Sequence, residues 1–255
     1  MTLSELDLYF RSFLEFEKYS ADSSRNGIQV DNSSPETKEI KKVAFAVDAC
    51  LETIKKAIQE EAQLLFVHHG MFWGACNPIR GDYGNRIREL IKNDVALYAC
   101  HIPLDANMEV GNNFGLAKRL NLQQLETFGM WKGMEIGVGG KLPKPLTLDQ
   151  ISQKLFPQGE KPLHVLPFGK KEIQSVGIIS GGAGRELSDG IEKGYDLYIT
   201  GEIYHEQYHL AKEAQIAVIA GGHYQTETVG VSLVMEKISA EKGIETVFID
   251  VPTGL

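Results

Sequence analysis

Histidines and carboxylates gather in three short segments of the chain, VHHGMFW, HIPLD and GHYQTE. Imidazole combined with carboxylate suits Fe, Zn, Mn or Co better than Ca or Mg. Five such ligands are more than one tetrahedral ion needs, and they suit two ions that share carboxylates. The segments therefore predict a site for two divalent transition-metal ions, with the ligands His68, His69, Asp105, His223 and Glu227.

Each of these segments has a simpler interpretation when taken alone. Adjacent histidines are more often structural or exposed than ligating, and HxxxD or HxxxE arises easily by chance. Neighbouring residues of a strand also point to opposite faces, so one of the two histidines would face the core. For both rings to reach one site, we expect the strand that contains AQLLFV to end at Val67 or His68.

Further polar groups could move protons rather than bind metal. The segment TGEIYHEQYH places Glu202 and His205 three residues apart on a predicted helix, a spacing known from metal sites, although exposed helix histidines are commoner. We predict His101, Glu202 and His205 as catalytic proton carriers. The glycine-rich SGGAG turn could offer backbone N–H groups to a phosphate, or it could simply be a tight turn.

Strand-like and helix-like patterns alternate around these segments. Strands are expected at residues 41–48, 62–69 and 95–101, and helices at 51–61 and 84–94. This alternation is typical of βαβ units, so it predicts a mostly parallel sheet covered by helices. Sites in such sheets form beyond the carboxyl ends of the strands, where the three polar segments could converge.

The same pattern occurs twice along the chain. Residues 42–69 align without a gap with residues 175–202, and LYACHIPLD aligns with IAGGHYQTE at an offset of 122 residues, His101 to His223. Any two βαβ segments resemble each other to some degree, but these copies also agree in their polar residues. We interpret them as two related α/β units from an internal duplication. The expected domains are residues 1–127 plus 218–255, and residues 128–217.

Composition narrows the class of protein. The chain has 255 residues and a net charge of -8 at pH 7, which argues against general binding to nucleic acid or to anionic membranes. Its three cysteines form no CxxC pair, which favours a reducing cytoplasm. The N-terminus reads as an amphipathic helix in which Thr2 and Glu5 form a capping box, and no apolar run approaches the length of a membrane span.

The ordered motifs resemble the NIF-three-like dinuclear metal centre family, whose members are often called GTP cyclohydrolase I type 2 homologues. The motifs DSSRNGIQV, VHHGMFW, HIPLDA, SGGAG, TGEIYH and GHYQTE carry the resemblance from about Asn26 to Glu227. It implies two intertwined three-layer α/β/α units with the metals between them, and a toroidal homohexamer. By the same resemblance His101 and His205 match additional histidines of the pocket. Arg25 stands where family members usually have cysteine.

The resemblance leaves two classes of function open. The reaction assigned to the family is hydrolysis of GTP, in which water attacks C8 of guanine, formate leaves, and dihydroneopterin triphosphate results. A metal-dependent phosphodiesterase is a variant of this hypothesis with another substrate. The alternative is a metal-binding regulatory or interaction protein without enzymatic activity, because the predicted ligands report the metal and not the substrate.

Overall fold

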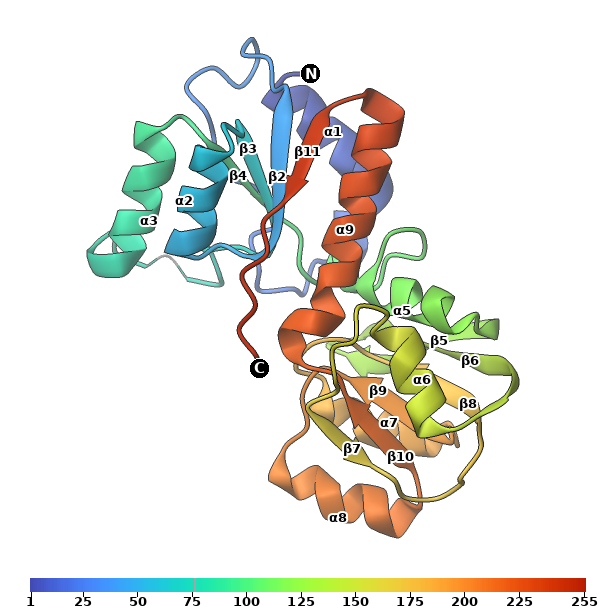
Figure 1. Ribbon diagram of the computed structural model, residues 1–255. Coiled ribbons are helices and arrows are strands. Elements are labelled where there is room, and N and C mark those ends of the chain that lie inside the picture. The colour runs from blue at the N-terminus through green and yellow to red at the C-terminus, as the bar shows by residue number, and fades with distance from the viewer. Residues whose placement is uncertain (76) are drawn as a thin grey trace. The chain divides into compact units, whose positions relative to one another are not determined.

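The chain folds into two α/β units in the computed structural model, which describes residues 1–75 and 77–255 (Figure 1). Unit 1 comprises Met1–Leu104 and Val231–Val251, and unit 2 comprises Asp105–Gly230 and Pro252–Leu255. The chain passes between the units within helix α4 (Ile102–Asp105) and again within helix α9 (His223–Lys242). Each unit contains a sheet of its own.

Unit 1 contains a five-stranded sheet that is parallel except at one edge. The edge strand β1 pairs antiparallel with β4. Across the sheet the strands are β1 (Gly27–Val30), β4 (Ala96–Ala99), β3 (Leu64–His69), β2 (Lys42–Asp48) and β11 (Glu245–Phe248). The helices of this unit include α1 (Leu3–Leu14), the 3₁₀ helix η1 (Phe16–Tyr19), α2 (Leu51–Gln59) and α3 (Gly81–Lys92).

Alternating side chains of this sheet face two helical layers. Leu65 and Val67 of β3 belong to an apolar cluster with Ile54 of α2 and Ile87 of α3. Phe66, on the opposite face, packs 5.0 Å from the ring of Phe10 on α1. In Figure 1, α2 and α3 lie on one side of the sheet, and α1 with the C-terminal half of α9 lies on the other. This unit is therefore a three-layer α/β/α structure.

Unit 2 contains a six-stranded mixed sheet, in which β8, β9 and β10 are parallel to one another. Across the sheet the strands are β5 (Gln123–Trp131), β6 (Met134–Leu146), β8 (Ile173–Ile178), β9 (Leu197–Thr200), β10 (Ala217–Ala220) and β7 (His164–Leu166). The helices include α5 (Asn112–Leu120), α6 (Leu148–Leu155), η2 (Gly184–Glu186), α7 (Leu187–Glu192) and α8 (His205–Ala214).

Each sheet contains the same arrangement of three consecutive parallel strands, in agreement with the predicted duplication. Strands β2, β3 and β4 follow one another in parallel, and so do β8, β9 and β10. Val43 pairs with Leu64, and Val176, which lies 133 residues after Val43, pairs with Leu197 in the same way. The third strands match less simply, because Ala99 takes the place of Ala220 at an offset of 121 rather than 122.

The division into units differs from the boundaries expected at 127/128 and 217/218. Strand β5 pairs with β6, so the chain has already entered the second sheet at Gln123. Strand β10 pairs with β9 and stays in that sheet, whereas β11 pairs with β2. Strands β5 and β6 form a hairpin, in which Lys132 and Gly133 turn the chain with positive φ angles.

The capping box expected at the N-terminus is confirmed. Thr2 accepts a hydrogen bond from the backbone of Glu5, and Glu5 accepts one in return, which completes the capping box. Thr147 and Gln150 do the same at the start of α6. Within the described part of the chain, none of the helices combines the length and apolar character needed to cross a membrane. Cys76 lies outside the described residues.

Replacing Phe66 with alanine tests the aromatic layer of unit 1. Phe66 is fully buried and packs on Phe10, Phe45 and Tyr98. We expect Phe66→Ala to lower the free energy of unfolding by about 3–5 kcal/mol, measured by urea denaturation. Leu8→Ala is the control, because Leu8 on α1 is 70% exposed. Equal effects of the two substitutions would contradict this packing.

Candidate metal centre

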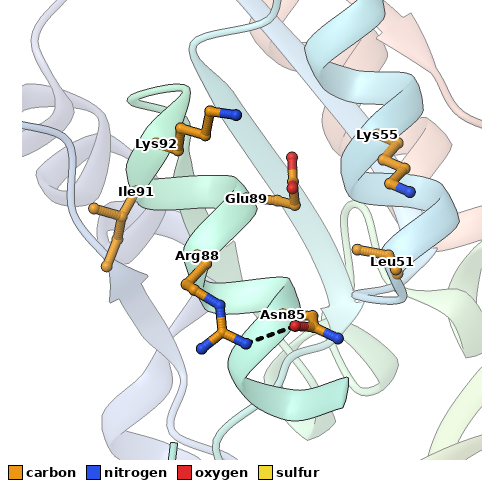
Figure 2. Close-up of a pocket in the computed structure, with 7 residues that line it drawn as sticks. All are labelled: Leu51, Lys55, Asn85, Arg88, Glu89, Ile91 and Lys92. Atoms are coloured by element: carbon orange, nitrogen blue, oxygen red, sulfur yellow. Dashed lines mark hydrogen bonds between the residues drawn. The ribbon is translucent and has the colours of Figure 1, made fainter. Parts of the chain in front are cut away.

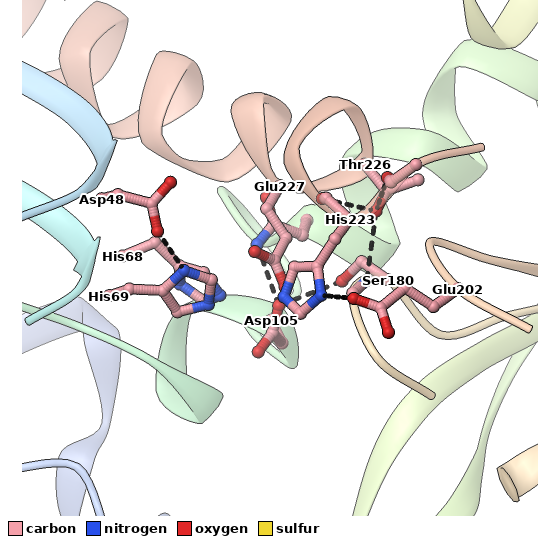
Figure 3. Close-up of polar contacts among 12 residues, drawn as sticks. Asp48, His68, His69, Asp105, Ser180, Glu202, His223, Thr226 and Glu227 are labelled. Atoms are coloured by element: carbon pink, nitrogen blue, oxygen red, sulfur yellow. Dashed lines mark hydrogen bonds and ion pairs between the residues drawn. The ribbon is translucent and has the colours of Figure 1, made fainter. Parts of the chain in front are cut away.

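His68 and His69 both belong to strand β3, which runs through His69 and pairs it with Asp48 of β2. The expectation that the strand ends at Val67 or His68 is therefore wrong, because Asp48 gives the strand a partner for one more residue. The two rings nevertheless lie close, with centroids 4.6 Å apart. Nδ1 of His69 also lies 2.9 Å from Oδ1 of Asp48 (Figure 3).

The tautomer of His68 follows from its hydrogen bond. His68 is fully buried, and its Nδ1 lies 2.9 Å from the carbonyl oxygen of Cys100 at the end of β4. A carbonyl oxygen only accepts hydrogen bonds, so Nδ1 carries the proton. The lone pair of His68 is then on Nε2, the nitrogen that can bind a metal.

His101 brings a third imidazole to the same cluster. One ring nitrogen from each of His68, His69 and His101 lies within 4.8 Å of the other two. Nδ1 of His101 lies 3.0 Å from Oδ1 of Asp22, whose side chain is only 1% exposed. Burial alone would raise the pKa of Asp22, but the hydrogen bond and charge of His101 outweigh it and lower that pKa. Asp22 is therefore a carboxylate that orients His101.

The residues after His69 shape the wall of this cluster. The Trp73 ring meets the His101 ring edge to face, with centroids 4.8 Å apart. Its Nε1 donates to the carbonyl oxygen of Gly70. A Cβ atom on Gly70 would lie 2.5 Å from Cβ of Ala99, so glycine is required at this turn. Phe72 packs on Tyr83 of α3.

Unit 2 contains two buried carboxylates, Asp105 and Glu227. One oxygen from each lies within 4.8 Å of the other. Oδ1 of Asp105 accepts hydrogen bonds from Nδ2 of Asn112 at 2.9 Å and from Oγ of Ser180 at 3.0 Å. Two buried carboxylates this close repel each other, and a cation bound to both would remove that repulsion.

His223 lies between two carboxylates. Its Nδ1 is 2.5 Å from Oε1 of Glu202, and its Nε2 is 3.1 Å from Oε1 of Glu227 (Figure 3). Burial alone would lower the pKa of His223. The hydrogen bonds and charges of Glu227 and Glu202 outweigh burial and raise that pKa to about 9. In the metal-free protein His223 is therefore an imidazolium at neutral pH.

The SGGAG turn makes room for these side chains. Gly181 has a φ of +65°, and a Cβ atom there would lie 2.1 Å from Oε1 of Glu227. Its N–H donates to Oγ1 of Thr226, so this amide is already used within the protein. Of the two interpretations of the turn, the structure favours a tight turn that allows the close approach of Glu227 over a phosphate site at Gly181.

The predicted proton carriers are placed differently from one another. Helix α8 begins at His205, so Glu202 lies before the helix and not on it, because Tyr204 is extended and forms the N-cap. Glu202 contacts His223. His205 is exposed, and its ring packs on His209 with centroids 6.4 Å apart.

One pattern unites the four imidazoles of the two units. In each, Nδ1 meets a fixed oxygen: the Cys100 carbonyl for His68, and the carboxylates of Asp48, Asp22 and Glu202 for His69, His101 and His223. Histidines that bind metals through Nε2 almost always use their other nitrogen in this way. The residues present therefore fit transition-metal ions.

Sequence analysis did not identify these oxygen partners. Asp48 ends a predicted strand beside the His68–His69 strand, and Asp22 begins the DSSRNG motif, so both had a signal that could have been used. The carbonyl of Cys100 had none, because every residue has a carbonyl group. Asp105 is held by Asn112, seven residues later, and by Ser180, which belongs to the distant SGGAG motif.

A groove of about 570 Å³ lies elsewhere on unit 1, between α2 and α3 (Figure 2). Its lining combines the charged residues Lys55, Arg88, Glu89 and Lys92 with the apolar residues Leu51 and Ile91. None of the predicted site residues lines it. The groove is thus separate from the imidazole cluster of unit 1.

Comparison with known proteins finds one family and several relatives that match the chain over its whole length. A family model described as Duf34/NIF3 (NGG1p interacting factor 3) matches residues 1–254. A GTP cyclohydrolase 1 type 2 homolog from Treponema pallidum is 45% identical, and one from Archaeoglobus fulgidus is 43% identical. In both comparisons the alignment covers 100% of each chain.

Solved structures share the fold over the same extent. The protein TTHA1606 of Thermus thermophilus matches with a TM-score of 0.89 and 37% identity, covering 100% of each chain. Reduced HcgD from Methanocaldococcus jannaschii matches with a TM-score of 0.85 and 25% identity, covering 98% of each chain. The chain therefore has full-length relatives in both sequence and structure.

The raised pKa of His223 predicts how the metal-free protein responds to pH. Because the pKa is higher in the folded protein than the usual value of about 6.5, protonation of His223 stabilises the fold. This contribution is complete below pH of about 6.5 and is lost as pH rises through about 9. Histidine NMR titration of metal-free protein should give a pKa near 9 for His223, and Glu202→Gln should lower it. A pKa at or below 6.5 would contradict the two-carboxylate arrangement.

Proposed function

The chain belongs to the Duf34/NIF3 family, and from that membership and the geometry of its imidazoles we propose that it binds two divalent transition-metal ions. The proposed ligands are His68, His69, Asp105, His223 and Glu227. The observation that carries the proposal is the shared arrangement of the imidazoles, each with Nδ1 held by a fixed oxygen. Such partners set the tautomer and the ring orientation of metal-binding histidines.

The five ligands divide into two chemical types. His68, His69 and His223 offer Nε2 lone pairs, which suit Zn, Fe, Mn or Co. Asp105 and Glu227 offer carboxylate oxygens, and a carboxylate can bridge two ions. Metal binding at neutral pH requires His223 to lose the proton that it shares with Glu202 and Glu227.

We further propose that the bound metals serve hydrolysis, with GTP as the substrate that the names of the relatives suggest. Two such ions, when bound, would lower the pKa of a bound water toward neutral pH. They would also stabilise the negative charge that develops on the attacking oxygen in the tetrahedral intermediate. Oε1 of Glu202 accepts the proton on Nδ1 of His223, and Asp22 holds Nδ1 of His101 so that Nε2 of His101 can take or give a proton. His205 stays a prediction in this role, as do the ring of six copies and the cytoplasmic location.

Asp105→Asn is the sharpest substitution for testing this function. Asparagine keeps the volume and one acceptor oxygen for Asn112 and Ser180, but it removes the negative charge that a metal requires. We expect metal content to fall below two ions per chain and formate release from GTP to drop by more than about 100-fold. The effect should be this large because replacing even a residue that only contacts a metal ligand lowers metal affinity or activity by about 10- to 100-fold. Elemental analysis and a formate assay measure the two quantities.

Asp31→Ala is the matched control, because Asp31 is exposed and lies outside the ligand set. Two bound ions in the wild type without formate release, whichever common divalent metal is supplied, would reject GTP hydrolysis. That result would favour a metal-binding regulatory or interaction protein without enzymatic activity. An assay with a phosphodiester substrate would then test the alternative of a metal-dependent phosphodiesterase. No metal in the wild type after metal-replete expression would reject the metal centre itself.

A further inference from the structure

Tyr204 occupies a fixed position at the start of α8. Its backbone N–H donates to Oε1 of Gln207 at 3.0 Å, and its carbonyl oxygen accepts from the backbone N–H of the same residue. Gln207 is itself buried. The backbone of Tyr204 is therefore held in place, although its side chain is 42% exposed.

The side chain of Tyr204 lies against the glycine-rich turn. A Cβ atom on Gly184 would lie 3.0 Å from the carbonyl oxygen of Glu202 and 3.4 Å from Cδ2 of Tyr204. A Cβ atom on Gly182 would lie 3.8 Å from the Tyr204 hydroxyl. The absence of side chains at Gly182 and Gly184 thus allows the segment from Glu202 to Tyr204 to pack closely against the turn, next to Gly181, which makes room for Glu227.

A chain of three contacts leads from the Tyr204 hydroxyl to the proposed ligands. The hydroxyl donates to Oε2 of Glu202 at 3.0 Å. The other oxygen of Glu202 lies 2.5 Å from Nδ1 of His223, and Nε2 of His223 lies 3.1 Å from Oε1 of Glu227. Glu202 contacts Tyr204 with one oxygen and His223 with the other, and His223 likewise uses one nitrogen for Glu202 and one for Glu227. The orientation of each side chain therefore constrains the next.

Glu202 needs this second contact in order to hold His223. Its side chain is 33% exposed, and a partly exposed glutamate has several rotamers available. The hydrogen bond to Glu202 raises the pKa of the Tyr204 hydroxyl, so the hydroxyl stays protonated and keeps donating at neutral pH. One carboxylate is thereby fixed at both oxygens.

We propose that Tyr204 is a positioning residue of the metal centre: by holding Oε2 of Glu202 it fixes Oε1 on Nδ1 of His223 and so orients Nε2 of His223 toward the metal. This inference rests on the proposed function, since it requires His223 to be a ligand. It assigns a role to a residue outside the predicted site. It also explains the glycines of the SGGAG turn, because they allow Glu202, Tyr204 and Glu227 to approach closely.

Tyr204→Phe tests the inference, and Tyr208→Phe is the matched control. Phenylalanine keeps the ring and removes only the hydroxyl. Tyr208 lies on the same helix, is 43% exposed, and packs on Phe168 and His209. Binding of Co²⁺ to metal-free protein is measured by competition with a chromophoric chelator, and the visible absorption of the bound Co²⁺ reports the geometry of its ligands.

We expect Tyr204→Phe to weaken the binding of one Co²⁺ ion by about 10-fold, the lower end of the range for outer partners of ligands. Its Co²⁺ spectrum should change, while the thermal midpoint of the metal-free protein should stay close to the wild type. Tyr208→Phe should match the wild type in all three measurements. Adding Tyr204→Phe to Glu202→Gln should weaken binding little further, because both substitutions break the same chain.

Three outcomes would overturn the inference. Wild-type affinity and an unchanged spectrum in Tyr204→Phe would reject Tyr204 alone and leave the proposed metal centre standing. Additive effects of the two substitutions would show that Tyr204 does not act through Glu202. Absence of Co²⁺ binding by the wild-type protein would reject the metal centre, and the positioning role would fall with it.

Discussion

The candidate metal centre depends on one recurring constraint, the hydrogen bond that fixes Nδ1 of each imidazole. A histidine side chain has two nitrogens and can rotate about two bonds, so its residue type alone does not say which atom meets a metal. Here a carbonyl or a carboxylate meets Nδ1 in all four cases, so Nε2 is the nitrogen proposed to bind metal in His68, His69 and His223 and to transfer a proton in His101. The strands that end beside the histidines supply most of these oxygens. The fold therefore contributes orientation as well as proximity.

This arrangement places charged groups where they are costly for the metal-free protein. Asp105 and Glu227 are buried carboxylates with oxygens within 4.8 Å of each other. Burying such groups costs several kcal/mol unless charges and hydrogen bonds offset the loss of water, on the order of the whole stability of a small domain. Asn112 and Ser180 supply hydrogen bonds to Asp105, and the imidazolium of His223 supplies positive charge beside Glu227. A metal ion would supply more charge still, which couples metal binding to stability.

Sequence analysis reached the framework more completely than the details of the site. Short, nearly continuous apolar runs located β2, β3 and β4, since each strand is buried on both faces. The duplication was visible because both copies repeat that pattern, and their strand registers agree at Val43 and Val176. The division between units was not visible, because it depends on which strands pair across long separations. Strand β5 joins β6, and the chain returns to β2 only at β11.

The sequence did not reveal the exact placement of several polar residues, for a related reason. Whether Glu202 belongs to α8 depends on the extended backbone of Tyr204, which the helical spacing of TGEIYHEQYH does not reveal. The end of β3 depends on Asp48, a residue of another strand. The glycines of SGGAG resemble a phosphate loop in sequence, but Gly181 makes room for Glu227. For β3 and for SGGAG, a partner distant in sequence decides the role of a locally ambiguous motif.

The central claim is that five named side chains bind two metal ions, and anomalous X-ray diffraction from crystals of the Co²⁺-loaded protein tests it most directly. The account predicts two anomalous peaks about 3.5–4 Å apart, with Nε2 of His68, His69 and His223 and oxygens of Asp105 and Glu227 as their protein ligands. A single peak, or peaks at other residues such as His205 and His209, would contradict it.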